Sequence, residues 1–114
     1  MPCIVTKVNV KITEEKEKVI KEKLGKAIAL IPGKSESWLM LSFEDECRLY
    51  FKGSKNEGIA FVEIKLFGKA SGDAYEKLTA AITGILNEEL GISPSQIYVK
   101  YEEVSHWGWN GGNF

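Results

Sequence analysis

Arginine is almost absent from this sequence. Arg48 is the only arginine among 15 basic residues, and the 16 acidic residues bring the formal net charge to −1. A general nucleic-acid-binding protein needs an excess of basic charge to neutralise phosphates, so this composition argues against one. Bidentate recognition of phosphate, for which arginine is the best-suited side chain, also has little to draw on. We therefore expect no nucleic acid among the partners of this protein.

Cysteines and long apolar runs are scarce as well. The two cysteines, Cys3 and Cys47, are too far apart to form a Cys-x-x-Cys redox pair, and we interpret them as the reduced thiols of a cytoplasmic protein. No apolar run approaches the length of a membrane span, and residues 1–10 lack the charged-then-apolar layout of a signal peptide. We expect a cytoplasmic protein with no membrane partner; secretion by a route that needs no signal peptide is the alternative.

The remaining composition is that of a globular protein, since 44% of the 114 residues are hydrophobic and 27% are charged. This length predicts a single domain over residues 1–114. Within it, one plan of strand, helix and strand occurs twice, over about residues 1–57 and 58–114. The repeated plan is the main guide to the fold.

In the first half, residues 2–10 have the character of a strand, and Thr13 is a plausible N-cap for a helix. Pro32-Gly33 ends that helix, and residues 37–44 form a second strand. The apolar face of the helix consists of residues at helical spacing: Val19, Ile20, Leu24, Ala27, Ile28 and Ile31.

In the second half, residues 59–67 form a strand and residues 68–72 a turn. Asp73 and Glu76 resemble a capping box at the start of the second helix, which Gly91 closes. A last long strand covers residues 97–102, and a tail rich in aromatic residues and glycine follows.

Two β-α-β units predict an α+β fold with a four-stranded mixed sheet and both helices on one face. We expect the other face to be apolar and uncovered, because its strands carry apolar residues on both sides, among them Leu39, Leu41, Phe61, Ile64, Tyr98 and Val99. A large exposed apolar patch usually marks an interface, so this pattern predicts a homo-oligomer.

Pro2 is the residue with the most chemical interest. It follows Met1 directly, and a methionine before so small a residue is normally removed. The new terminus would be a secondary amine, and a free α-amino group has a reference pKa of roughly 8. A terminus that begins a strand is held in place, which makes this amine a candidate general base. The alternative is structural, because proline also suits the first position of a strand.

Several motifs combine into a resemblance that spans essentially the whole chain. They are Pro2, Pro32-Gly33-Lys34, Phe67-Gly68-Lys69, Gly91-Ile92-Ser93-Pro94 before Ile97–Tyr101, and Gly108-Trp109-Asn110-Gly111 before Phe114. In this order and spacing the sequence resembles the macrophage migration inhibitory factor and D-dopachrome tautomerase family of the tautomerase superfamily. The Ile-Ser-Pro segment and the Gly-Trp-Asn ending are its more specific parts.

The resemblance implies a homotrimer with sites at subunit interfaces and keto–enol tautomerisation of substrates such as phenylpyruvate or dopachrome. It makes Pro2 the base, Lys34 a substrate-binding cation and Phe67 the residue whose backbone amide contacts substrate. Tyr98 would come from a neighbouring subunit. Trp38, Trp107 and Phe114 would form the aromatic rim and wall. Burial among aromatic side chains and the charge of Lys34 should both lower the pKa of the proline amine. This chemistry requires no cofactor and no metal ion.

The sequence departs from the family at Lys100, where an asparagine is frequent. A second cation could strengthen carboxylate binding or alter substrate choice; a solvent-facing strand lysine is the equal alternative. A cytokine-like binding or signalling protein on the same trimeric scaffold, with a protein receptor and vestigial tautomerase activity, is the alternative to the enzyme. Dehalogenation or decarboxylation is disfavoured, because such reactions usually need arginines beyond Arg48.

Overall fold

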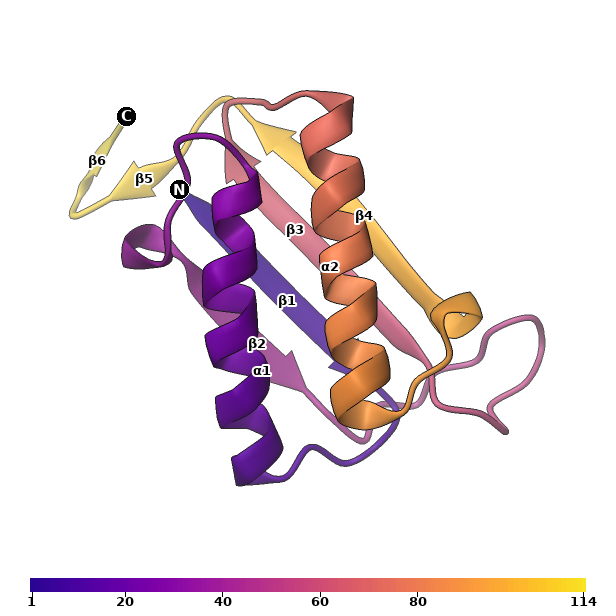
Figure 1. Cartoon of the computed structure of the whole chain (residues 1–114). Helices are drawn as coiled ribbons and strands as arrows, with labels where there is room; N and C mark the ends of the chain where they lie inside the picture. The colour runs from indigo at the N-terminus through magenta and orange to yellow at the C-terminus, as the bar shows by residue number, and fades with distance from the viewer.

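A computed structural model describing residues 1–114 shows a four-stranded mixed sheet with two helices packed on one face (Figure 1). The strands lie in the order β2-β1-β3-β4; β1 pairs parallel with β2 and antiparallel with β3, and β3 pairs parallel with β4. The predicted fold class is therefore confirmed. The elements are β1 (Pro2–Val8), α1 (Glu14–Ala27), β2 (Met40–Glu44), β3 (Ala60–Phe67), α2 (Gly72–Leu90) and β4 (Ile97–Val104).

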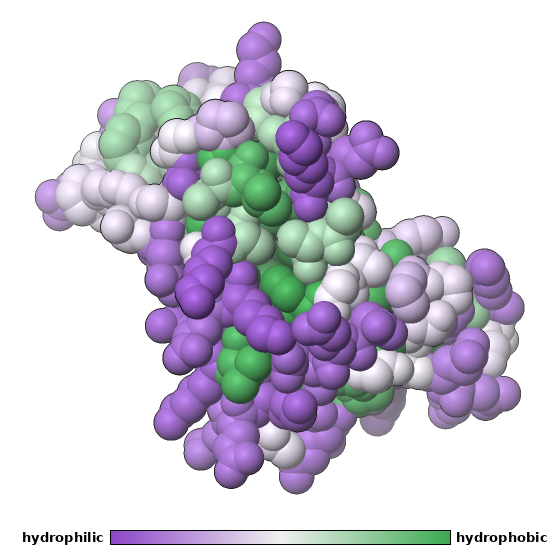
Figure 2. All heavy atoms as spheres, viewed as in Figure 1, coloured by the Kyte–Doolittle hydropathy of each residue, from purple (hydrophilic) through white to green (hydrophobic).

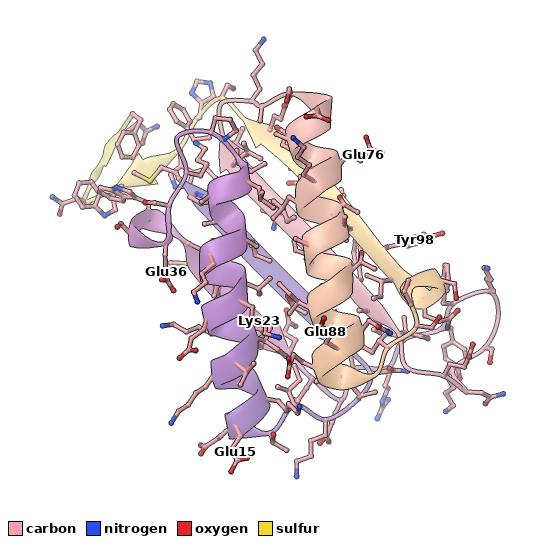
Figure 3. All side chains as sticks on the ribbon, in the orientation of Figure 1. Glu15, Lys23, Glu36, Glu76, Glu88 and Tyr98 are labelled. Atoms are coloured by element: carbon pink, nitrogen blue, oxygen red, sulfur yellow. The ribbon has the colours of Figure 1, made fainter.

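Capping side chains set where the two helices begin. The Thr13 hydroxyl accepts a hydrogen bond from the Lys16 N–H at the start of α1, as predicted. The predicted capping box at α2 is wrong, because Ser71 is the N-cap and accepts from the Ala74 N–H. Glu76 is exposed and directed outward (Figure 3). At its other end α2 stops at Gly91, whose φ of 67° is the left-handed conformation that glycine adopts without steric cost.

Local structure around the strands differs from the prediction in two places. The strand expected over residues 37–44 begins only at Met40, and Trp38 lies in a short 3₁₀ helix, Glu36–Trp38. The tail forms a small hairpin of β5 (Gly108–Trp109) and β6 (Gly112–Asn113). Its two-residue turn, Asn110-Gly111, has positive φ at both positions, as a type I′ hairpin requires.

The hydrophobic core lies between the sheet and the two helices. Ile4, Ile64 and Leu66 of the sheet are buried there with Leu24 of α1 and Leu78 of α2. On the helical face in Figure 2, hydrophobic residues gather along the line between the helices and hydrophilic residues flank them. None of the helices is both long and apolar enough to span a lipid bilayer.

The sheet face opposite the helices is not the continuous apolar surface that the sequence suggested. Paired residues of neighbouring strands share a face, and on this face Glu63 lies opposite Lys100, and Lys65 opposite Glu102. Leu39, Leu41, Ile64 and Val99 instead belong to or pack against the core. The expectation was wrong because successive side chains of a strand point to opposite faces, so Ile64 and Val99 face the helices and their charged neighbours take the open face. Opposite charges interrupt the apolar side chains, so the open face has a mixed character.

Candidate active site

The sheet itself holds the N-terminal end of the chain in place. Pro2 is buried and lies opposite Leu66 in the antiparallel β1–β3 pair. The ladder extends one residue further, because the Phe67 N–H donates to the Met1 carbonyl oxygen at 3.1 Å. Proline at the first strand position loses no ladder bond. The nitrogen of residue 2 therefore occupies a defined position at the end of β1.

Lys34 reaches the same place from the other end of α1. The chain leaves α1 through a short 3₁₀ helix, Ile28–Leu30, and turns so that the Lys34 N–H donates to the Ile31 carbonyl at 3.0 Å. The Lys34 ammonium then donates to the carbonyl oxygen of Phe67, also at 3.0 Å. Both peptide groups of Phe67 are thus engaged, one by Met1 and one by Lys34.

The electrostatics of this corner favour a neutral amine. Burial lowers the pKa of the Met1 α-amino group to about 6, and the charge and hydrogen bonding of Lys34 act in the same direction. A free α-amino group ordinarily titrates near 8. The Met1 amine therefore loses its proton more readily than an ordinary terminal amine, and the neutral form is the state that a general base requires.

Aromatic side chains line the region next to Phe67. The Trp38 and Trp109 rings meet edge to face with centroids 4.9 Å apart, and Trp109 is stacked on Phe114 at 6.3 Å. Phe114 is in turn 5.8 Å from Phe67. Trp107 is half-buried, and its carbonyl accepts from the Phe114 N–H at 3.0 Å. Figure 1 shows the β5–β6 hairpin and the C-terminus at the same end of the molecule as the N-terminus.

Trp109 is the residue that sequence reasoning missed. The Gly-Trp-Asn segment carries part of the family resemblance, which implies no role for its tryptophan. The available signal was the Asn110-Gly111 turn, which predicts a hairpin and hence a fixed position for the preceding residue.

Tyr98 and Lys100 are not assembled with Pro2 within one chain. Tyr98 lies opposite Phe61, five residues along β3 from the partner of Pro2, which corresponds to roughly 17 Å. It is 61% exposed (Figure 3) and its ring is 4.8 Å from that of Phe51. The Lys100 ammonium lies 2.9 Å from Glu102, and this hydrogen bond, with the charges of Glu102 and Glu63, raises the pKa of Lys100.

The histidine and the acidic residues form no metal centre. His106 is exposed in the connection before Trp107. No group of three or more His, Cys, Asp or Glu side chains is arranged to hold a metal ion. The groups gathered at the Pro2 end are an amine, the Lys34 ammonium, the Phe67 N–H and aromatic side chains.

Comparison with known proteins finds one family over the whole length of the chain. The model of the macrophage migration inhibitory factor family matches residues 1–114. Macrophage migration inhibitory factor of Mus musculus is 26% identical over 116 residues, covering 100% of this chain and 99% of the mouse protein. The crystal structure of Leishmania major MIF2 superposes with a TM-score of 0.92 at 31% identity, covering 100% of this chain and 97% of that one. A homologue from Prochlorococcus marinus gives 0.87 at 28%, covering 98% of each chain.

Proposed function

The chain belongs to the macrophage migration inhibitory factor family, and on that premise we propose that it is a keto–enol tautomerase acting on aryl 2-oxo acids such as phenylpyruvate. Pro2 is the general base after Met1 is removed, and no cofactor takes part. The substrate-binding residues are Lys34, Phe67, Trp38, Trp107 and Phe114 from one subunit, with Tyr98 and Lys100 from a neighbour in a homotrimer.

The observation that carries the proposal is the position of Met1. Its carbonyl oxygen accepts from the Phe67 N–H, and only the carbonyl carbon separates that oxygen from the Pro2 nitrogen. Removal of Met1 would free the proline amine and the Phe67 donor in one event. A substrate oxygen that replaced the Met1 oxygen would then lie within contact distance of the base.

The reaction follows from these groups. The Pro2 nitrogen takes a proton from the carbon next to the substrate carbonyl, the electron pair shifts onto the carbonyl oxygen, and a proton returns to that oxygen, so that no atom is gained or lost. The Phe67 N–H stabilises the charge that develops on oxygen. Lys34 attracts the carboxylate, and the aromatic wall of Trp38, Trp109 and Phe114 suits an aryl group.

The depressed pKa of the terminal amine supports the choice of base. Burial and Lys34 lower the pKa of the Met1 amine to about 6, and the proline amine would lie one residue deeper along β1. Because a base acts in its neutral form, such an amine is ready at neutral pH without first passing a proton to another side chain.

The test compares three forms of the protein in phenylpyruvate tautomerisation, each verified by intact mass: processed wild type, Pro2→Gly, and protein that retains Met1. Activity should be confined to the processed wild type, with a fall of at least about a hundredfold in the other two. Pro94→Ala is the matched control and should stay active, because Pro94 precedes the start of β4, at the end of the sheet away from Pro2. Equal rates in all four forms would exclude Pro2 as the base.

A second candidate is a cytokine-like binding or signalling role on the same scaffold. The observation that favours it is the family itself, whose mouse member is named for inhibiting macrophage migration. Processed wild type and Pro2→Gly would be compared in a macrophage migration assay. Equal inhibition by both proteins would support signalling independent of catalysis, and no effect from either would contradict it.

A further inference from the structure

The segment from Phe67 to Ser71 connects β3 to α2 and carries the backbone groups used at the Pro2 end. The Phe67 N–H and carbonyl are bonded to Met1 and Lys34, and the Gly68 N–H donates to the Val104 carbonyl at 3.0 Å. Connections between elements are usually the mobile parts of a fold. A hydrogen-bond donor that must meet a developing charge has to be held in position before the reaction.

One hydroxyl group secures this segment. The Tyr75 hydroxyl, in the first turn of α2, accepts from the Ala70 N–H at 3.0 Å and donates to the Glu103 carboxylate at 2.6 Å. It therefore ties the connection, through Ala70, to β4 at the residue before Val104. Burial and the Glu103 hydrogen bond raise the pKa of Tyr75, so the hydroxyl keeps the proton that it donates.

The Tyr101 ring packs against the ring that carries this hydroxyl, a contact that phenylalanine at position 101 would keep. The rings of Tyr75 and Tyr101 are 4.5 Å apart between centroids, and the Tyr101 hydroxyl donates to the Tyr75 carbonyl at 2.9 Å. Because that bond uses the only proton of the Tyr101 hydroxyl, Thr79 must be the donor in the 2.8 Å contact between the Thr79 and Tyr101 oxygens. The Tyr101 hydroxyl makes none of its hydrogen bonds to residues 67–71.

From this arrangement we infer that Tyr75 is a positioning residue for the proposed tautomerase site, acting through Ala70 to fix the peptide groups of Phe67. The inference rests on the proposed function. The Tyr75 hydroxyl makes its hydrogen bonds to Ala70 and Glu103 and none to Pro2. Its effect passes along the connection to the Phe67 N–H and to the carbonyl that anchors Lys34.

The test uses Tyr75→Phe, which keeps the ring on Tyr101 and removes both hydrogen bonds of the hydroxyl. We expect the kcat/KM for phenylpyruvate to fall at least tenfold. The kcat should fall because the Phe67 donor no longer meets the developing charge in one place, and the KM should rise because the carbonyl that anchors Lys34 is no longer fixed. The midpoint of the kcat/KM–pH profile should move upward, since a less firmly anchored Lys34 and freer access of water return the amine toward its ordinary pKa. Amide exchange at Gly68 and Ala70 should accelerate.

Two matched variants separate positioning from general stability. Tyr101→Phe removes hydrogen bonds from the same network without touching residues 67–71, so it should lower the melting temperature but leave the KM and the pH midpoint unchanged. Glu103→Gln keeps an oxygen acceptor for the Tyr75 hydroxyl, so its KM, its pH midpoint and its amide exchange at Gly68 and Ala70 should resemble those of the wild type.

Amide exchange makes the inference independent of catalysis. If the processed wild type proves inactive, the proposed function fails, and exchange at Gly68 and Ala70 alone decides about Tyr75: faster exchange in Tyr75→Phe than in Tyr101→Phe supports the positioning role. Tyr75→Phe with wild-type exchange, KM and pH midpoint would overturn it, whatever the change in melting temperature.

Discussion

Lys34 governs both the charge and the occupancy of the proposed site. Its ammonium bonds the Phe67 carbonyl and helps to lower the pKa of the terminal amine. Replacing it by methionine removes a like charge, so the pKa of the amine should rise. Because the base works only when neutral, activity is present above this pKa and lost as the pH falls through it. In Lys34→Met the kcat/KM–pH profile should shift to higher pH, and the KM should increase because the substrate carboxylate loses its cation.

Lys26→Met is the matched control for Lys34→Met. Lys26 is an exposed lysine in the last turn of α1, and its loss removes the same charge from the chain without touching Phe67. Its pH profile should coincide with that of the wild type. An identical displacement in both variants would mean that Lys34 acts through overall charge and not through its position.

Trp109 should contribute to the recognition of an aryl group. It stands between Trp38 and Phe114, and an aromatic contact of this kind is worth about 0.5–1.5 kcal/mol. Trp109→Ala should raise the KM for phenylpyruvate roughly three- to tenfold and leave the KM for pyruvate nearly unchanged. Steady-state kinetics with both substrates measure this; equal increases for both would contradict a wall that contacts the aryl ring.

Residues that belong to short sequence motifs could be found from the sequence, and residues positioned by long-range contacts could not. Lys34 and Phe67 were identified through the family resemblance, which their Pro-Gly-Lys and Phe-Gly-Lys motifs helped to carry, and the structure brings their polar atoms together. Tyr75 and Trp109 carry no such signal. Their positions depend on contacts with Glu103, Tyr101, Trp38 and Phe114, which are distant in sequence and meet only in the folded chain.

At the scale of elements, the two helix N-caps offer a clean comparison. Thr13 and Ser71 each accept one backbone N–H at the start of a helix. Alanine at either position should lower the free energy of unfolding by about 1 kcal/mol. The two effects should add in the double variant, because the sites share no partner. Chemical denaturation measures this, with Ser37→Ala as a control outside any helix N-cap.

The elements divide into those set by local patterns and those set by tertiary contacts. The helices and three of the four main strands follow from periodicity and from Thr13 and Gly91. The capping box was misassigned because Ser71 precedes Asp73 by two residues and either could serve as a cap. The strand expected from residue 37 starts late because Glu36–Trp38 form a 3₁₀ turn whose tryptophan packs on Trp109 of the distant hairpin.

At the scale of the whole molecule, one chain does not bring Tyr98 to Pro2. Because charged pairs interrupt the open face of the sheet, an exposed apolar surface no longer argues for association. The proposed trimer rests on the family and on the distance between Tyr98 and Pro2 within one chain. In a ring of heterologous contacts, a residue at one end of each subunit can meet the other end of the next. Sedimentation should show a species of about three times 12.7 kDa.

Mixing inactive variants tests that geometry directly. Pro2→Gly and Tyr98→Ala should each be inactive alone. Unfolded together in equal amounts and refolded, they should recover about a quarter of the wild-type activity, because a site that takes Pro2 and Tyr98 from different subunits is intact in that fraction of cases. No recovery, with mixed trimers verified by native mass spectrometry, would mean that Tyr98 is not shared in this way.

Both ends of the described chain lie at the same corner of the molecule. Met1 bonds Phe67, and Phe114 lies against the Phe67 ring, whereas the connection from Lys52 to Gly58 lies at the opposite end of the sheet (Figure 1). A fusion at the N-terminus would keep the Pro2 nitrogen in a peptide bond and so prevent the proposed amine from forming, and a fusion at the C-terminus would place foreign chain beside Phe67. The Lys52–Gly58 connection is no safer place for a label, because Phe51 directly before it contacts Tyr98, which the proposed trimer brings to the site of a neighbouring subunit.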